Sequence, residues 1–314
     1  MNNSQDVLIQ STYPLAGTLT IPEERRDTYP AVLIIAGTGK SDRDGNMKKV
    51  KFNIYKELAD FLNKEGFATL RYDKRGTHQS GGDYFATGLY DLIDDAVQCV
   101  KFLENNAKVN KKQIYILGHS EGALIAPAVS KKNPVAGLIL LAGAAEPSAD
   151  LLPRQNEMAY QEMNQTKGFK GWLFRALKVT EKSRKQNAKI FEKILQSNKE
   201  VMRIKGMKIN AKWVRETLSY NVNEFLEEVT CPVLAITGDK DIQVPPEHAK
   251  LIVEKVRGES EGHIIPDMNH IFRKYNKQHA ILSLMKEYKA QQNQPIDENL
   301  LDIMSVWLQK RKTE

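Results

Sequence analysis

Five apolar, β-branched runs constrain this chain most, because they read as strands buried on both faces and several of them end in glycine. The stretches between them carry apolar residues at helical spacing, for example in residues 51–64 and 90–103. Strands that alternate with amphipathic helices predict a mostly parallel, doubly wound α/β sheet whose strand ends face the same way. The five predicted strands lie within residues 29–39, 66–76, 113–120, 135–144 and 231–241.

The alternation stops after Ala145 and returns at Cys231. Residues 182–206 carry apolar positions that predict amphipathic helices in this interval. At the two ends of the chain, residues 6–22 predict an antiparallel hairpin at the sheet edge, and residues 296–312 predict a closing helix. We therefore expect a core domain of residues 1–146 and 230–314, with a helical cap insertion at residues 147–229.

The charge of the chain is concentrated in the predicted insertion. The net charge is +7, but residues 167–215 alone hold 15 Lys or Arg against three acidic residues, so the rest of the chain is net acidic. Such a segment either attracts anionic partners or forms a solvated face. It leaves open a binding protein that uses the basic cap, although no motif with interleaved aromatic residues indicates nucleic-acid binding.

The first residues and the lengths of the apolar runs indicate the compartment, and the cysteine spacing indicates whether the chain binds a metal. Residues 1–6 are polar, and no run approaches the length of about 18 apolar residues that would cross a membrane, so we expect a cytoplasmic protein without stable membrane insertion. Cys99 and Cys231 are far apart in sequence and lack the spacing of ligands, so we expect two buried, reduced thiols and no metal site.

The junction after the third predicted strand carries the strongest chemical signal. Residues 118–122, GHSEG, fit the pattern G-x-S-x-G, in which a sharp strand-to-helix turn exposes a serine at the carboxyl end of the sheet. Small residues at Gly118 and Gly122 are required because a β-carbon would crowd this turn. The apolar strand before the motif and the helix-like run after it favour Ser120 as a nucleophile over a serine in an ordinary turn.

A serine nucleophile needs a histidine base and a carboxylate that orients it, in the chain order Ser, acid, His. Asp239 and Asp241 both follow the strand within residues 231–241, and Asp241 is favoured because it lies past the turn that Asp239 caps. His270 follows the last strand-like run and is the expected base. His119 and His78 are expected near the mouth of the site as neighbours, because their place in chain order does not suit a base.

The negative oxygen formed during acyl transfer needs two N–H donors. The residue after the nucleophile supplies one, from Glu121, and the loop after the first central strand supplies the other, from Thr38 or, as the second choice, Gly39. The charged run at residues 42–44 is expected to form ion pairs and turn hydrogen bonds that hold this loop.

Five motifs of this chain resemble, in order, those of the α/β-hydrolases, and within them of bacterial carboxylesterases. The resemblance covers nearly the whole chain outside the predicted insertion. The motifs are GTGKSDRDGN at 37–46, RYDKRGTHQSGG at 71–82, GHSEG at 118–122, GDKDIQVPP at 238–246 and MNHIF at 268–272.

The resemblance implies an α/β-hydrolase fold with a helical cap over the site, a catalytic triad of Ser120, Asp241 and His270, and hydrolysis of a carboxylic ester. This chain departs from its relatives at two positions. Relatives often have histidine where Ala36 stands and a small residue where His78 stands.

The motifs together predict a serine carboxylesterase that works through an acyl-enzyme and needs no metal or organic cofactor. A thioesterase, an acyltransferase or a peptidase remains possible on the same fold, as does the binding protein noted above. We expect a small-molecule ester with an apolar acyl group as substrate, and no nucleic-acid partner. Apolar residues of the insertion are candidates for the acyl pocket, with packing of the helices as the alternative: Trp172, Phe174, Phe191, Ile194, Leu195 and Trp213.

Overall fold

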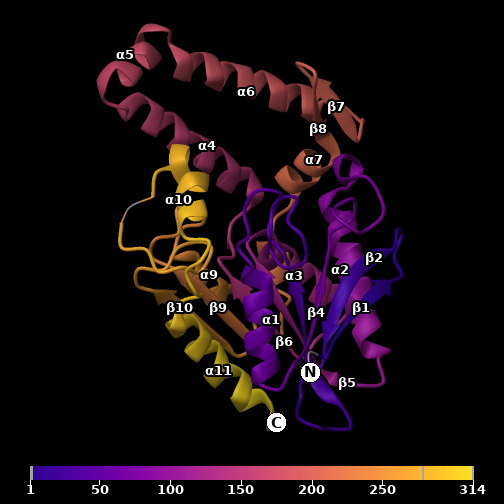
Figure 1. Cartoon of the computed structure of the whole chain (residues 1–314). Coiled ribbons are helices and arrows are strands. Elements are labelled where there is room, and N and C mark those ends of the chain that lie inside the picture. Colours follow the sequence, from indigo (N-terminus) through magenta and orange to yellow (C-terminus); the bar gives the residue numbers. More distant parts are fainter. Residues whose placement is uncertain (1–2, 278, 313–314) are drawn as a thin grey trace.

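An eight-stranded, mostly parallel sheet runs through the structure, a computed structural model that describes residues 3–277 and 279–312 (Figure 1). The strands lie in the order β1-β2-β4-β3-β5-β6-β9-β10, in which β1–β2 and β2–β4 pair antiparallel and all other neighbours pair parallel. The predicted strands and the edge hairpin are confirmed. The strands span Ser4–Ile9 (β1), Leu15–Thr20 (β2), Tyr29–Ile35 (β3), Ala68–Tyr72 (β4), Val109–His119 (β5), Gly137–Leu141 (β6), Val233–Gly238 (β9) and Ser260–Ile265 (β10).

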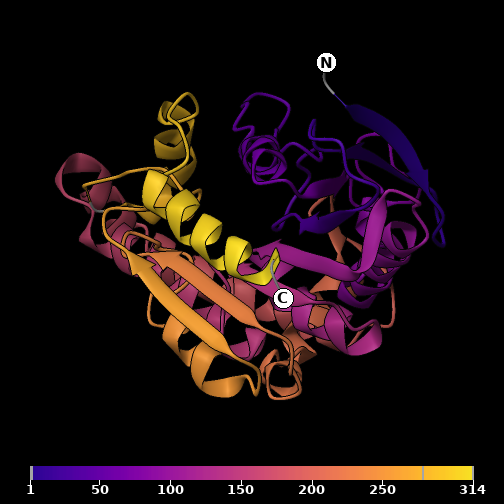
Figure 2. The same ribbon diagram turned by 90° about the horizontal axis from the view of Figure 1, so that it is seen from below.

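Helices cover both faces of this sheet, which makes it doubly wound as predicted (Figure 2). One apolar core lies between the sheet and α2, α3 and α9, and a second lies between the sheet and α1 and α11. The central strands β3, β4, β6 and β9 are buried along their whole length, because side chains on both of their faces enter these cores. The helices span Ile54–Lys64 (α1), Leu89–Glu104 (α2), Glu121–Lys132 (α3), His248–Lys255 (α9) and Glu298–Lys312 (α11).

The segment between β6 and β9, here called the inserted segment, lies above the carboxyl ends of the parallel strands (Figure 1). It is mainly helical, as predicted, and its division from the core as a separate domain stays a prediction. Its elements are α4 (Ser148–Gln165), α5 (Gly168–Ala176), α6 (Val179–Leu195), β7 (Val201–Ile204), β8 (Met207–Asn210), α7 (Ala211–Ser219) and α8 (Asn223–Leu226).

The hairpin of β7 and β8 corrects the prediction that residues 182–206 are helical. Helix α6 ends at Leu195, and residues 201–204 pair antiparallel with residues 207–210. The turn between them consists of Lys205 and Gly206, whose φ values of 50° and 80° suit a tight hairpin and not a helix.

A second segment also reaches the upper side of the molecule, a position that the sequence does not predict. The short helices η2 (Ile281–Ser283) and α10 (Leu284–Ala290) follow β10 and lie beside α4 (Figure 1). The Leu282 N–H donates to the Glu162 carboxylate of α4 at 3.3 Å. The strand ends are therefore covered from two sides, by α4 and α7 of the inserted segment and by α10.

The described residues include no membrane-spanning helix and no metal cluster, and they contain two free thiols. Among them, no helix combines the length and the apolar character needed to cross a membrane. They also hold no group of three or more His, Cys, Asp or Glu that could bind a metal ion. Both cysteines are free, and Cys99 is buried, but Cys231 is only half-buried, contrary to the prediction for that thiol.

The contact of α3 with β3 generates a prediction for stability. A β-carbon at Gly122 would lie 2.1 Å from the Ile35 carbonyl oxygen, so Gly122→Ala must push the helix away from the sheet. We expect it to lower the free energy of unfolding by roughly 2 kcal/mol or more, measured by urea denaturation. The matched control is Gly81→Ala, where the new β-carbon would meet side-chain atoms no closer than 3.2 Å. Equal stability of the two variants would contradict the prediction.

Candidate active site

Ser120 lies in the turn between β5, which ends at His119, and α3, which begins at Glu121. Its φ of 54° and ψ of −114° are a strained conformation for a residue with a side chain. The Ser120 N–H donates to the Leu141 carbonyl at 2.9 Å, and close packing at Gly118 and Gly122 leaves no room to relax the turn. The structure thus has the sharp strand-to-helix turn expected from the motif, with the serine half-exposed at its tip.

Asp241 and His270 are joined by a buried hydrogen bond of 2.7 Å between Asp241 Oδ2 and His270 Nδ1. The other Asp241 oxygen accepts the backbone N–H groups of Gln243 at 2.8 Å and Val244 at 3.0 Å. The carboxylate is therefore fixed by two backbone donors, and it fixes the tilt of the imidazole ring in turn.

Asp239, the second candidate for the acid, has different partners. Its Oδ1 accepts the Asp267 N–H at 2.7 Å, and its Oδ2 pairs with the Lys240 ammonium at 2.9 Å on the surface. It joins two loops and has no hydrogen bond to His270, so the geometry favours Asp241 as the histidine's partner.

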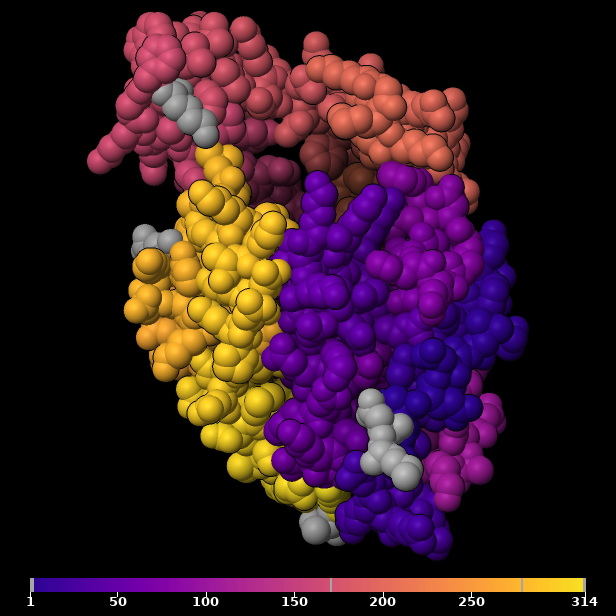
Figure 3. All heavy atoms as spheres, in the orientation of Figure 1, coloured from indigo at the N-terminus to yellow at the C-terminus, as the bar shows by residue number. Residues whose placement is uncertain are grey.

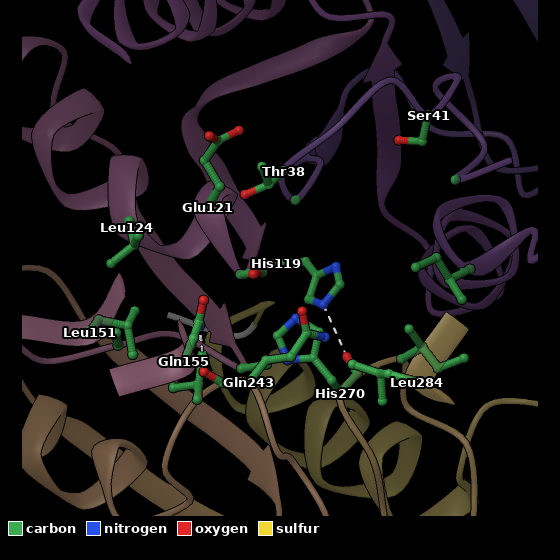
Figure 4. Close-up of a pocket in the computed structure, with 18 of the residues that line it drawn as sticks. Thr38, Ser41, His119, Glu121, Leu124, Leu151, Gln155, Gln243, His270 and Leu284 are labelled. Carbon is green, nitrogen blue, oxygen red and sulfur yellow. Dashed lines mark hydrogen bonds between the residues drawn. The ribbon is translucent and has the colours of Figure 1, made fainter. Parts of the chain in front are cut away.

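Ser120 and His270 line one cavity of about 350 Å³ between the core, the inserted segment and α10. The surface is hollowed between the inserted segment and the core (Figure 3), and Thr38 and Glu121 lie beside each other in the close-up of the cavity (Figure 4). Within the described residues, no hydrogen bond joins the Ser120 hydroxyl to the His270 ring. Such contacts commonly tighten only when a ligand is bound. Gly39, the second choice to Thr38, lines a separate and smaller cavity.

His119 is a buried neighbour of this cavity, held by a chain of hydrogen bonds. Its Nε2 lies 3.0 Å from the His270 carbonyl oxygen, which can only accept, so Nε2 carries the hydrogen. Its Nδ1 then accepts from the Tyr55 hydroxyl at 2.9 Å, and that hydroxyl accepts the Gly37 N–H at 2.8 Å. Burial lowers the pKa of His119 well below its ordinary value and raises that of Tyr55. His78, also expected at the mouth, is exposed and is not among the residues described as lining the cavity.

The walls of the cavity are mostly apolar. Glu121 is the one carboxylate among the described lining residues, which include no lysine or arginine. Its Oε2 lies 2.9 Å from the Lys74 ammonium, and both side chains are buried. Lining residues come from α2, α3, α4, α7 and α10, among them Leu89, Leu124, Leu151, Trp213, Leu284 and Met285.

Of the six candidates for the acyl pocket, Trp213 alone lines the cavity, so the acyl-pocket interpretation is wrong for the other five. Trp172 and Leu195 are 57% and 56% exposed, because α5 and α6 lie far above the strand ends (Figure 1). Ile194 is buried and Phe174 half-buried away from the cavity, whereas Phe191 lines a different pocket between α4 and α6. The lining from α10 was missed because a helix of seven residues carries little periodic signal.

The charged run at residues 42–44 has the structural role that was predicted. Arg43 pairs with Asp73 at 3.0 Å, and Asp44 pairs with Arg71 at 2.9 Å. These ion pairs attach the loop that carries Thr38 to the end of β4.

The buried position of His119 predicts that its ring stays neutral where an ordinary histidine gains a proton. A proton on Nδ1 would replace the acceptor of the Tyr55 hydroxyl by a second donor and place a charge in a buried site. We expect the His119 ring signals in a two-dimensional NMR spectrum to stay in place between about pH 8 and 5.5. A His119→Gln variant assigns the signals. A titration with a midpoint near about 6.5 would contradict the prediction.

Comparison with known proteins identifies one family and several relatives. Residues 50–273 match the family model described as serine aminopeptidase, S33. Esterase EstD of Thermotoga maritima is 24% identical over 298 residues, which cover 94% of this chain and 66% of that protein, slightly under two thirds of its length. A protein of Escherichia coli described as an uncharacterized 31.7 kDa protein in the traX-finO intergenic region is 26% identical over 212 residues, or 63% of this chain and 71% of that protein.

Solved structures share the fold over nearly the whole chain. Est1E from Butyrivibrio proteoclasticus superposes with a TM-score of 0.62 at 18% identity, covering 98% of this chain and 99% of that one. The structure of Est1E with ferulic acid bound gives 0.58 at 20% identity, with 91% and 98% covered. The Pyrococcus furiosus esterase Pf2001 gives 0.53 at 17% identity, with 92% and 88% covered.

Proposed function

This chain belongs to the α/β-hydrolase family described as serine aminopeptidase, S33, and from that premise we propose that it hydrolyses carboxylic esters with Ser120 as the nucleophile. The observation that carries the proposal is the buried 2.7 Å hydrogen bond between Asp241 and His270, because His270 lines the same mostly apolar cavity as Ser120 at its strained turn. The similarity to esterase EstD supports esters as the substrate class.

In the proposed reaction, His270 takes the Ser120 proton as the hydroxyl oxygen attacks the ester carbonyl carbon. Asp241 holds the Nδ1–H of the ring and stabilises the imidazolium that forms. The backbone N–H groups of Thr38 and Glu121 donate to the carbonyl oxygen as it becomes negative. The C–O bond to the alcohol then breaks, and the alcohol leaves with the proton from His270. Water, deprotonated by the same ring, hydrolyses the acyl-enzyme and restores the serine.

The lining of the cavity argues for esters of uncharged, apolar acids over the aminopeptidase activity in the family description. An aminopeptidase must bind the ammonium group of its substrate, which calls for a carboxylate. The carboxylate among the described lining residues is that of Glu121, and Lys74 and the Trp213 N–H already occupy its two oxygens. A substrate ammonium would have to compete with a buried lysine for it.

A panel of substrates tests this proposal. We expect purified protein to hydrolyse p-nitrophenyl esters of uncharged acids, and methyl ferulate is included because Est1E was solved with ferulic acid. Leucine p-nitroanilide should react at least about 100-fold more slowly in kcat/KM, because its ammonium lacks a partner in the cavity.

Ser120→Ala serves as the control and should lower kcat for the esters by at least about 10³-fold. Full activity of this variant, or a preference for the anilide, would overturn the proposal. Faster turnover of acyl-thioesters than of any ester in the panel would point to a thioesterase on the same residues.

A pair of variants distinguishes the two candidate acids. Asp241→Asn should lower kcat by about 10³- to 10⁴-fold, since an amide neither fixes the required ring tautomer nor stabilises the imidazolium. Asp239→Asn makes the same chemical change two residues before Asp241 and should keep kcat within about threefold. The reverse order of effects, measured with the best ester, would move the role of the acid to Asp239.

A further inference from the structure

A buried ion pair that the proposed reaction does not use lies directly beside the serine turn. Lys74 follows β4, and its ammonium lies 2.9 Å from Glu121 Oε2, with side chains that are only 5% and 4% exposed. Removing two charges from water costs about as much as their attraction returns, so a buried pair is a weak source of stability. Its position next to Ser120 points to a role in the geometry of the site.

Lys74 also controls the orientation of one peptide group. Its ammonium donates to the Gly37 carbonyl oxygen at 2.6 Å. The Gly37 carbonyl and the Thr38 N–H belong to the same planar trans peptide and point in opposite directions. A carbonyl held toward Lys74 therefore turns the Thr38 N–H away from Lys74. The Gly37 N–H is fixed on the preceding peptide by the Tyr55 hydroxyl, so the loop is held on both sides of Gly37.

Glu121 connects this lysine to the inserted segment. Its Oε1 accepts the Trp213 indole N–H at 2.8 Å, and Trp213 lies on α7 and lines the cavity. Asn210 caps α7 by accepting the Trp213 backbone N–H at 2.9 Å, and it donates to the carbonyls of Tyr84 and Thr87 at 2.7 Å each. The indole therefore reaches Glu121 only when α7 is seated on the core.

We infer that Lys74, Glu121 and Trp213 form a positioning relay, in which the seated α7 holds the Thr38 N–H where the negative oxygen forms. This inference rests on the proposed function. Glu121 then acts twice, through its backbone N–H and through its carboxylate, which keeps Lys74 aimed at the Gly37 carbonyl. The inserted segment contributes to the rate of the chemical step and not to substrate binding alone.

Lys74→Met is the main test, because it keeps the apolar stem and removes the donor. We expect kcat for the best ester to fall by about 10- to 100-fold with KM changed less than about threefold, since the Thr38 donor matters most in the transition state. The inhibition constant of a trifluoromethyl ketone, which forms a tetrahedral adduct with the serine, should rise in proportion to the loss in kcat/KM.

Two further variants separate the relay from a merely structural role. Trp213→Phe keeps an aromatic wall and removes the N–H donor, and its effect on the inhibition constant should be smaller than that of Lys74→Met. The double variant Lys74→Met/Trp213→Phe should lose no more kcat and inhibitor affinity than Lys74→Met alone, because Lys74→Met already breaks the relay. Lys131→Met is the matched control, since Lys131 forms a 2.9 Å pair with Glu228 on the exposed surface and should leave both readouts unchanged.

The outcomes distinguish this inference from the proposed function. If the wild-type protein shows Ser120-dependent ester hydrolysis but Lys74→Met retains kcat and inhibitor affinity, the relay is wrong and the function stands. If Lys74→Met does not fold, Glu121→Gln replaces it, because it keeps the size of the side chain and removes its charge. Additive effects in the double variant would also overturn the relay. Absence of any Ser120-dependent hydrolysis would instead overturn the proposed function.

Discussion

The contact between Gly122 and the end of β3 is the constraint on which the site depends. It lets α3 begin directly against the sheet, because a β-carbon at Gly122 would lie only 2.1 Å from the Ile35 carbonyl oxygen. The chain must then reverse within one residue, and Ser120 takes the positive φ that this requires. The start of α3 is thereby aimed at the cavity, where the helix dipole favours negative charge. The strain at Ser120 and the suitability of the place for an oxyanion have the same origin.

The frame around this turn is polar and yet carries little net charge. The His119 ring is hydrogen-bonded to Tyr55 and the His270 carbonyl, and burial lowers its pKa, while the charge of Lys74 is balanced by Glu121. Fully paired groups of this kind rigidify a buried region without leaving a charge to attract water. The polar groups that fix the loops beside this apolar cavity must all be paired, because burying an unpaired charge costs far more free energy than leaving a charge on the surface.

The sequence predicts the sheet, the serine turn and the Asp241–His270 pair well, because each follows from local pattern and chain order. Residues 32–35 are all apolar and must be buried in any fold of this chain. The GHSEG turn needs small residues at its two glycine positions because of its own tight backbone. The residues that line the cavity are predicted less well, because Leu284 belongs to a short helix without clear periodicity. Trp213 is a similar case: its indole N–H meets Glu121 across 92 positions in the chain, a pairing that no spacing rule encodes.

The charge of the inserted segment shows why composition is a poor guide to a site. On α6, Lys182, Lys185, Lys189 and Lys193 recur at spacings of three and four, which places them along one exposed side of the helix. None of the described lysines or arginines lines the cavity, whose walls from the inserted segment come from α4 and α7. Exposed charges more than about 10 Å from the reacting atoms are largely screened at physiological salt. A net charge of +7 therefore does not argue for an anionic substrate, and the apolar walls at Leu151 and Trp213 are the better guide to what the cavity accepts.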